Sequence, residues 1–414
     1  MSLTTLALPE NISFCRNNNE ISITLATDLP LTTANLKIKC ILFIEHDYGS
    51  GTFWPYVQLL DPDENGECKF FWHDIIEDIF EHQFDDLPST TPVIAQHVVR
   101  NYKFLAVELS GDPQTSTDAL ISGSLTTQRQ AVYGGIALEK FSERPFFGLT
   151  NWHGQELQKS FFDNMGATVR TFTDQMQFLP FWWHNYPGVG NYLACKVAVK
   201  MYKSDGTTQT IYPYSEPVNI NQVIHFPVGF TQLALVGYET ASVKVIKYEV
   251  WTYGTAAMGN VSQPNSSHIR TYHVRRDYQE FKRYLYYRNS LGTLSAFAIC
   301  GRMIRDVNVK KEMALSYWEK GYNQFKGGTV NSYNQIIDRM EFATGTLTAA
   351  EERQLIDILQ SDHLIVGAIN GQKQLPVDIA SLKISPTEDQ NIKTFNIALM
   401  PKFNNQIADV MAVE

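Results

Sequence analysis

Two clusters of aromatic residues are the part of this sequence best suited to binding chemistry. One lies within 144–153 and the other within 178–187, and both place aromatic rings next to Pro, Asn and His. Exposed rings of this kind can stack on sugars, and Trp, Tyr and Arg also concentrate at the centres of protein interfaces. The same residues can pack in the core of a β-sandwich. All three interpretations stay open for the candidate binding residues Trp152, Trp182, Trp183 and Tyr186.

The sequence contains no motif that specifies catalysis or cofactor binding. Its ten histidines form no HExxH pattern, and its five cysteines form no CxxC pair. Gly188–Ala194 is similar to a dinucleotide-binding loop, but the last glycine is missing and the preceding segment, Phe181–Pro187, is not a parallel strand. Phe325–Gly328 lacks the spacing and the Ser or Thr of a P-loop. We therefore predict no catalytic residue, no metal site and no cofactor.

The composition favours strands and surfaces that are covered by partners. Hydrophobic residues make up 44% of the 414 positions, which excludes disorder throughout the chain. Aromatic residues reach 12%, and they pack well on pleated sheets. Charged residues are only 19%, a low fraction that suits contact with other proteins.

Targeting signals are not evident in the sequence. Met1–Pro9 has neither a basic region nor a long apolar region, so we expect no signal peptide. No apolar run reaches the ~18 residues that span a bilayer, so we expect no membrane span. The scattered cysteines indicate buried thiols in a protein that folds in a reducing cytosol, with a disulfide among the first three as the alternative.

Strand patterns separated by turns predict a mainly β chain. We expect two β-sandwich-like domains in series followed by a smaller α+β domain. The predicted ranges are 1–112 with one short amphipathic helix, 126–262, and 268–414 as an assembly domain. The predicted strands include Asn11–Cys15, Glu20–Ala26, Leu36–Ile44, Cys68–Trp72, Val98–Leu109, Leu193–Tyr202, Thr208–Tyr212, Gln232–Gly237 and Val243–Tyr253.

Two segments have helical spacing. Within Asp74–Phe84 the apolar positions recur at the helical period, and the outer face is acidic. A second helix is predicted to begin at Thr348, which can cap it with Glu351 at the third helical position, the arrangement called a capping box. Its predicted buried stripe is Leu355, Ile356 and Leu359.

Charge is distributed unevenly along the chain, whose net charge is −9. Residues 1–92 contain fifteen Asp and Glu against four Lys and Arg, whereas residues 270–311 contain ten Lys and Arg against three Asp and Glu. Opposite charges at two ends suit head-to-tail association into a ring or a stack. Two solvated faces are the alternative. The candidate interface charges are Arg275, Arg276 and Arg283.

Several patterns occur together, mostly in the second half of the chain. They are Tyr133–Ile136, His225–Phe230, Tyr286–Thr293, Cys300–Gly301, Glu351–Ser361, Leu375–Ile379 and Thr394–Leu399. In this combination the chain resembles structural proteins from the tail or baseplate of tailed bacteriophages and related contractile particles. The resemblance is strongest over 225–405 and weak over the first 110 residues.

The resemblance implies a non-enzymatic structural protein of the virion tail that is assembled in the host cytoplasm. Its implied partners are copies of itself, in a ring or a stack, and neighbouring tail proteins. No nucleic acid partner is expected. The alternative is a glycan- or receptor-binding adhesion module of a virion. A glycoside hydrolase has only the aromatic richness in its favour.

Overall fold

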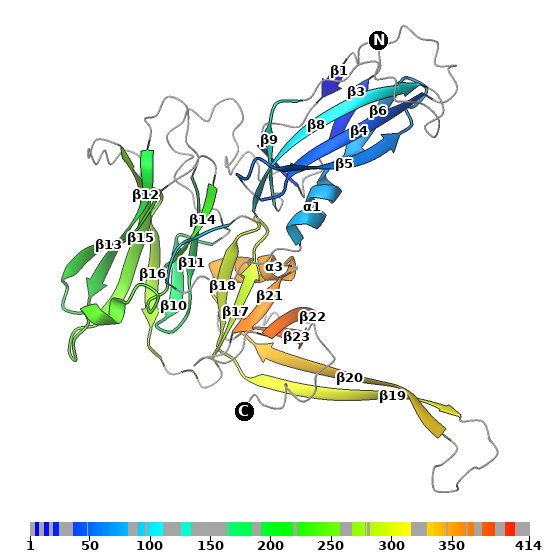
Figure 1. Cartoon of the computed structure of the whole chain (residues 1–414). Helices are drawn as coiled ribbons and strands as arrows, with labels where there is room; N and C mark the ends of the chain where they lie inside the picture. Colours follow the sequence, from blue (N-terminus) through cyan, green and yellow to red (C-terminus); the bar gives the residue numbers. More distant parts are fainter. Residues whose placement is uncertain are drawn as a thin grey trace. The chain divides into compact units, whose positions relative to one another are not determined.

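The fold is given by a computed structural model of the chain (Figure 1). It describes residues 5–7, 12–15, 20–24, 36–47, 49–81, 90–95, 98–110, 126–133, 163, 165–183, 192–217, 222–256, 267–277, 279, 282–315, 329–344, 347–361, 363–367, 375–385 and 394–401. These residues form twenty-three strands and two α-helices. The prediction of a mainly β protein is therefore confirmed.

The chain divides into two compact units. Unit 1 contains Met1–Val274 and Asn289–Leu294, and unit 2 contains Arg275–Arg288 and Ser295–Glu414. The chain passes between the units three times, and a six-residue turn of unit 1 is flanked by strands of unit 2. The finer division into three domains stays a prediction.

Unit 1 contains a first pair of sheets. The smaller has the order β1-β3-β6, with β1 (Thr5–Ala7), β3 (Glu20–Thr24) and β6 (Glu67–Phe71). The larger has the order β2-β9-β8-β4-β5, with β2 (Ile12–Phe14), β9 (Arg129–Val132), β8 (Val99–Ser110), β4 (Leu36–Glu45) and β5 (Phe53–Leu60). Neighbouring strands are antiparallel, except that β2 and β9 are parallel.

The core of this pair lies between the two sheets. Burial alternates along β3 and β6, as expected for strands with one face toward a core. Helix α1 (His73–Glu81) adds Ile76 and Phe80, which confirms the apolar face predicted there. Other members of the cluster are Ile21, Ile23, Ile38, Cys40, Leu42, Phe70, Trp72, Tyr102 and Phe104.

A second pair of sheets completes unit 1. One has the order β10-β16-β15-β12-β13, with β10 (Thr168–Phe172), β16 (Arg270–Arg275), β15 (Val245–Ala256), β12 (Tyr192–Lys203) and β13 (Thr208–Pro217). The other has the order β11-β14-β7, with β11 (Phe178–Trp183), β14 (Gln222–Pro227) and β7 (Val93–Ile94). Their shared core includes Leu179, Phe181, Val197, Val199, Ile224, Phe226, Tyr248, Val250 and Tyr272.

The predicted strand Gln232–Gly237 is wrong. These residues form turns and the 3-10 helix η2 (Leu235–Tyr238), and Ala234 has a left-handed φ of 53°. The side chain of Gln232 folds the chain back, because its Oε1 accepts backbone hydrogen bonds from Gly229 and Gln177 at 2.8 Å each. The apolar run still supplies side chains to the core, so hydrophobicity alone does not distinguish this turn from a strand.

Unit 2 is built on one antiparallel sheet. Its order is β18-β17-β21-β22-β23-β20-β19, with β18 (Leu294–Ile299), β17 (Arg283–Arg288), β21 (Leu364–Gly367), β22 (Leu375–Ser385), β23 (Thr394–Pro401), β20 (Thr329–Ala343) and β19 (Met303–Leu315). Figure 1 shows β19 and β20 extending from this sheet as a long ribbon. Pairing with β23 involves only Met340–Ala343 of β20.

Helix α3 (Ala349–Leu359) covers part of the unit 2 core and begins as predicted. The backbone N–H of Glu351 donates to Thr348 Oγ1 at 3.3 Å, and the backbone N–H of Thr348 donates to Glu351 Oε2 at 2.7 Å. The capping box is therefore confirmed.

The predicted buried stripe of α3 is wrong at two of its three positions. Leu355 is buried, but Ile356 is 57% exposed and Leu359 is 41% exposed. The buried face is instead centred on Gln354 and Ile358, which lie about one turn apart. Ile356 stands midway between them in sequence, so a helix of ~3.6 residues per turn places it on the opposite side.

All five cysteines are free thiols. Four are buried and Cys300 is partly buried, so the prediction of buried thiols holds for four and the alternative disulfide is not formed. Burial raises the pKa of the Cys68 thiol to about 11, which keeps it protonated and unreactive at neutral pH. In the described part of the chain, no helix has the length and apolar character needed to cross a membrane.

Candidate functional site

The predicted aromatic site is only partly described by the structure. Trp182 and Trp183 lie on β11, where they pair with Val223 and Gln222 of β14. The side chain of Trp182 is half-buried and packs against the apolar cluster that contains Val223. Trp152, Tyr186 and the side chain of Trp183 lie outside the described residues. A binding role for these four residues stays a prediction.

The predicted interface charges are largely engaged by their neighbours. Arg275 forms an ion pair with Asp277, and its hydrogen bonds lower the pKa of Asp277 to about 2. Arg283 donates to the backbone carbonyl of Lys282 at 2.9 Å, whereas Arg276 is exposed. The basic stretch also includes two buried side chains, Arg270 and Arg288, so its formal charge overstates what can face a partner.

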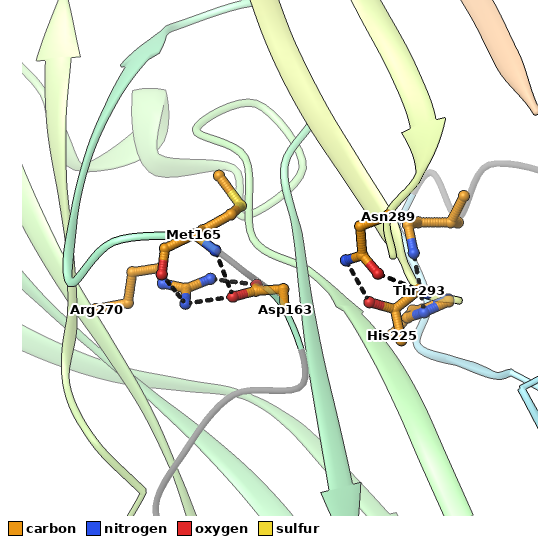
Figure 2. A network of polar contacts seen from close by, with 7 residues as sticks. Asp163, Met165, His225, Arg270, Asn289 and Thr293 are labelled. Atoms are coloured by element: carbon orange, nitrogen blue, oxygen red, sulfur yellow. Dashed lines mark hydrogen bonds and ion pairs between the residues drawn. The ribbon is translucent and has the colours of Figure 1, made fainter. Parts of the chain in front are cut away.

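A buried ion pair joins β16 to the segment before β10 (Figure 2). Arg270 donates to both oxygens of Asp163, and Arg270 Nη2 lies 2.7 Å from Asp163 Oδ1. Asp163 also accepts from the backbone N–H of Met165 at 3.1 Å. Because the pair is desolvated and bidentate, its geometry suits a structural tie between two segments.

The turn Asn289–Leu294 is the part of unit 1 that lies between β17 and β18. Asn289 Oδ1 accepts from the backbone N–H groups of Leu291 and Thr293 at 3.0 Å each, and Asn289 Nδ2 donates to Thr293 Oγ1 at 2.7 Å. Figure 2 shows this network next to His225. His225 Nε2 accepts from the backbone N–H of Leu294 at 3.3 Å, which assigns the ring hydrogen of a neutral histidine to Nδ1. The turn is thus fixed by its own side chains and by β14.

One outer sheet face in unit 1 combines aromatic rings with lysines. Burial alternates along β15, where Tyr248, Val250 and Thr252 are buried and the residues between them are partly exposed. The register with β12 places Lys196 opposite Tyr253 and Lys200 opposite Glu249 on this outer side. We define the aromatic–lysine face as Lys196, Lys200, Tyr202, Tyr212, Lys247, Glu249, Trp251 and Tyr253.

The side chains of this face are held by one another. Tyr202 donates to Glu249 Oε2 at 2.7 Å, and Lys247 Nζ lies 3.4 Å from Glu249 Oε1. The Nζ atoms of Lys247 and Lys200 lie 4.1 Å and 5.1 Å from the centre of the Tyr202 ring, within the range of cation–π contacts. These contacts restrict the side chains before any ligand arrives.

The tyrosines at the other end of the face form a ring pair. Tyr212 and Tyr253 are in T-shaped contact with centroids 6.1 Å apart, and Tyr212 is 64% exposed. Burial, together with the nearby Tyr212 phenol, raises the pKa of Tyr253. The phenol of Tyr253 is therefore protonated at neutral pH and can donate a hydrogen bond.

A second exposed surface follows β5, the edge strand of its sheet. Trp54, Val57 and Leu59 are 51%, 56% and 45% exposed. We define these three residues with Phe53 and Pro55 as the β5 surface, in which Trp54 lies on one face of the strand and the other four residues lie on the opposite face. Pro55 has no N–H group, so it is compatible only with the free side of an edge strand.

Neither surface contains a group of side chains that could hold a metal ion. Among the residues that the structure describes, no group of three or more His, Cys, Asp or Glu side chains could hold a metal ion. No protein-family model and no curated protein matches this chain.

Sequence reasoning missed both surfaces for different reasons. Part of the aromatic–lysine face is predictable from the sequence, because Lys247, Glu249, Trp251 and Tyr253 occupy every second position of a predicted strand. Its second half depends on the register with β12, which no local pattern specifies. The β5 strand has side chains exposed on both faces and a proline, so it lacks the alternation that marks a half-buried strand.

Proposed function

We propose that this protein is a non-enzymatic structural component of a phage tail or baseplate. In this proposal it assembles with copies of itself and with neighbouring tail proteins through protein–protein interfaces. The observation that carries the proposal is the β5 surface, where three large apolar side chains are about half exposed on an edge strand. Val57 and Leu59 lie two residues apart on one face of the strand and Trp54 lies on the other face, and large apolar side chains exposed in this way mark protein interaction sites.

The shape of β5 favours a partner that packs on its side chains over a partner that continues the sheet. An edge strand offers unpaired N–H and C=O groups to another strand. Pro55, the third of the eight residues of β5, removes one of these donors, so a continuous ladder cannot form along the whole strand. A neighbour that covers Val57 and Leu59 would bury apolar area without needing that ladder.

The β19–β20 ribbon gives independent support. Within the described residues, β20 pairs with β19 from Thr329 to Phe342, and only its last four residues also pair with β23. A two-stranded ribbon is marginally stable in water by itself. Contact with a neighbouring subunit would stabilise such a ribbon.

Light scattering of the purified protein, alone and with neighbouring tail proteins, tests the proposal. Val57→Lys and Leu59→Lys should weaken assembly, because each puts a charge into an apolar contact while leaving the exposed site of the monomer unstrained. Val236→Lys is the matched control, since Val236 is 64% exposed and lies outside the β5 surface. A strict monomer that joins no particle would refute the proposed function.

A further inference from the structure

The aromatic–lysine face presents its side chains in two rows. Lys247, Glu249, Trp251 and Tyr253 follow one another on β15 at every second residue, so neighbours in the row stand ~7 Å apart. Lys196 and Lys200 form the parallel row on β12, opposite Tyr253 and Glu249. The result is an elongated surface on which an extended chain can make repeated contacts.

The rings of this face are outside the core. Val197 and Val250, on the opposite side of the same sheet, fill the space between the two sheets. Tyr212 is 64% exposed, and Trp251 and Tyr253 are partly exposed. Indole and phenol rings combine a large apolar surface with one polar atom, which suits a ligand that is apolar on one face and polar at its edges.

The polar groups of this face include both hydrogen-bond donors and hydrogen-bond acceptors. Lys196, Lys200 and Lys247 donate hydrogen bonds, whereas Glu249 accepts them at the centre of the face. Hydroxyl groups both donate and accept, so a polyhydroxylated ligand can satisfy the lysines and the carboxylate together. For a densely anionic ligand Glu249 is locally unfavourable, because it places a negative charge at the centre of the face.

We propose that the aromatic–lysine face binds a glycan chain, with sugar rings stacked on Trp251, Tyr253 and Tyr212. The sugar hydroxyls are hydrogen-bonded by Lys200, Lys247 and Glu249, and Lys196 offers a contact for an occasional carboxylate on the chain. The site is independent of the β5 surface and of the assembly proposed above. It also lies on different strands from Trp182 and Trp183, which belong to β11.

The observations favour a glycan over single-stranded nucleic acid. Nucleic-acid grooves neutralise phosphates along the whole strand, and the resulting affinity falls steeply with salt. Here the face has three lysines, and one of them, Lys247, is ion-paired with the carboxylate of Glu249 at 3.4 Å. The charge left for a polyphosphate is small, whereas the mixed donors and acceptors match hydroxyl groups.

Affinity electrophoresis of the full chain tests this site, with dextran as a neutral probe, alginate as a carboxylated probe and oligothymidylate as the nucleic acid probe. We expect retardation by dextran or alginate that changes little with salt. Trp251→Ala and Tyr212→Ala should each reduce affinity by about two- to tenfold, the effect of losing one aromatic contact. Tyr212→Ala is the safer variant for folding, because the side chain is largely exposed and lies on the edge strand β13.

Phe71→Ala is the matched control, since Phe71 is an aromatic residue of an edge strand, is 48% exposed, and lies outside both surfaces. It should bind both polysaccharides as the wild type does. Three results would overturn the inference: no retardation by either polysaccharide, retardation that Tyr212→Ala leaves unchanged, or preferential salt-sensitive binding of oligothymidylate. Because the readout is glycan binding, it is distinct from the assembly that tests the β5 surface.

Discussion

Replacing Gly292 by alanine tests how tightly the turn Asn289–Leu294 is held in unit 1. Gly292 has a φ of +82°, and a Cβ atom there would lie 2.6 Å from Cδ1 of Tyr133. Tyr133 is fully buried and its ring packs edge-on against Phe80, so it cannot move aside easily. The substitution therefore combines a backbone penalty with a steric one.

Gly206 provides the control that separates these two penalties. Its φ is +83°, and nothing lies within 4 Å of the position that a Cβ atom would take. The two turns also share their backbone hydrogen bonds, since Gly206 N–H donates to Lys203 as Gly292 N–H donates to Asn289. An alanine at either position meets the same left-handed backbone, but only position 292 meets a ring.

The expected magnitudes follow from this comparison. A non-glycine residue in the left-handed region costs ~1–2 kcal/mol, which is the whole effect expected for Gly206→Ala. Overpacking a buried contact adds ~1–3 kcal/mol, so Gly292→Ala should cost ~2–5 kcal/mol in total. The loss of stability cannot exceed the free energy that holds the turn against Tyr133. A larger penalty would detach the turn from Tyr133 instead.

Urea unfolding followed by fluorescence measures both variants, with hydrogen exchange of peptides around Tyr133 and Leu291 as a local readout. We expect Gly292→Ala to lose more free energy of unfolding than Gly206→Ala. Amide hydrogen exchange near Tyr133 should become faster only in Gly292→Ala. Equal losses of unfolding free energy in the two variants, with unchanged hydrogen exchange near Tyr133, would refute the packing of the turn against Tyr133.

Three further predictions concern ion pairs and helix α3. Asp163→Asn leaves the buried guanidinium of Arg270 without its charge partner, so it should lower the urea midpoint by the equivalent of ~3–5 kcal/mol. Asp277→Asn, at an exposed ion pair, should change the midpoint by the equivalent of only ~0–1 kcal/mol. Because the folded pKa of Asp277 is lowered to about 2 from 3.8, its small contribution is present above ~pH 4 and lost as the pH falls toward ~2, so the wild type and Asp277→Asn should converge there in acid unfolding. Ile358→Asp should abolish the unit 2 melting transition in calorimetry, whereas Ile356→Asp should leave it in place, because only Ile358 is buried; equal effects would contradict the orientation of the helix.

Local features of the fold were predictable from the sequence. The cap of α3 needs only Thr348 and Glu351, three residues apart, so a short pattern specifies it. The buried face of the same helix depends on which side the sheet of unit 2 covers, and this is a tertiary property. Ile356 and Leu359 are apolar but exposed, so hydrophobicity alone assigns them to the wrong face of the helix.

Contacts between distant segments were not predictable. Asn289, Ser290 and Gly292 are residue types that favour a turn, but nothing near them in the sequence specifies Tyr133 as a neighbour of Gly292. The same holds for β9, which lies in the range predicted for the second domain but pairs with β8 of the first. The candidate surfaces could not be predicted from local sequence for the same reason, because each is formed by strands that come together only in the folded protein.

The membership of Asn289–Leu294 in unit 1 affects how this protein can be made on a ribosome. Synthesis proceeds from the N-terminus, and domains generally fold as units while the chain emerges. Unit 1 cannot be completed when residue 274 emerges, because it also requires a turn that follows β17. Its last step waits until residue 294 has left the exit tunnel, when the first strand of unit 2 is already outside. The two units are therefore linked in the order of their folding, and neither can be exchanged between proteins as a single uninterrupted cassette.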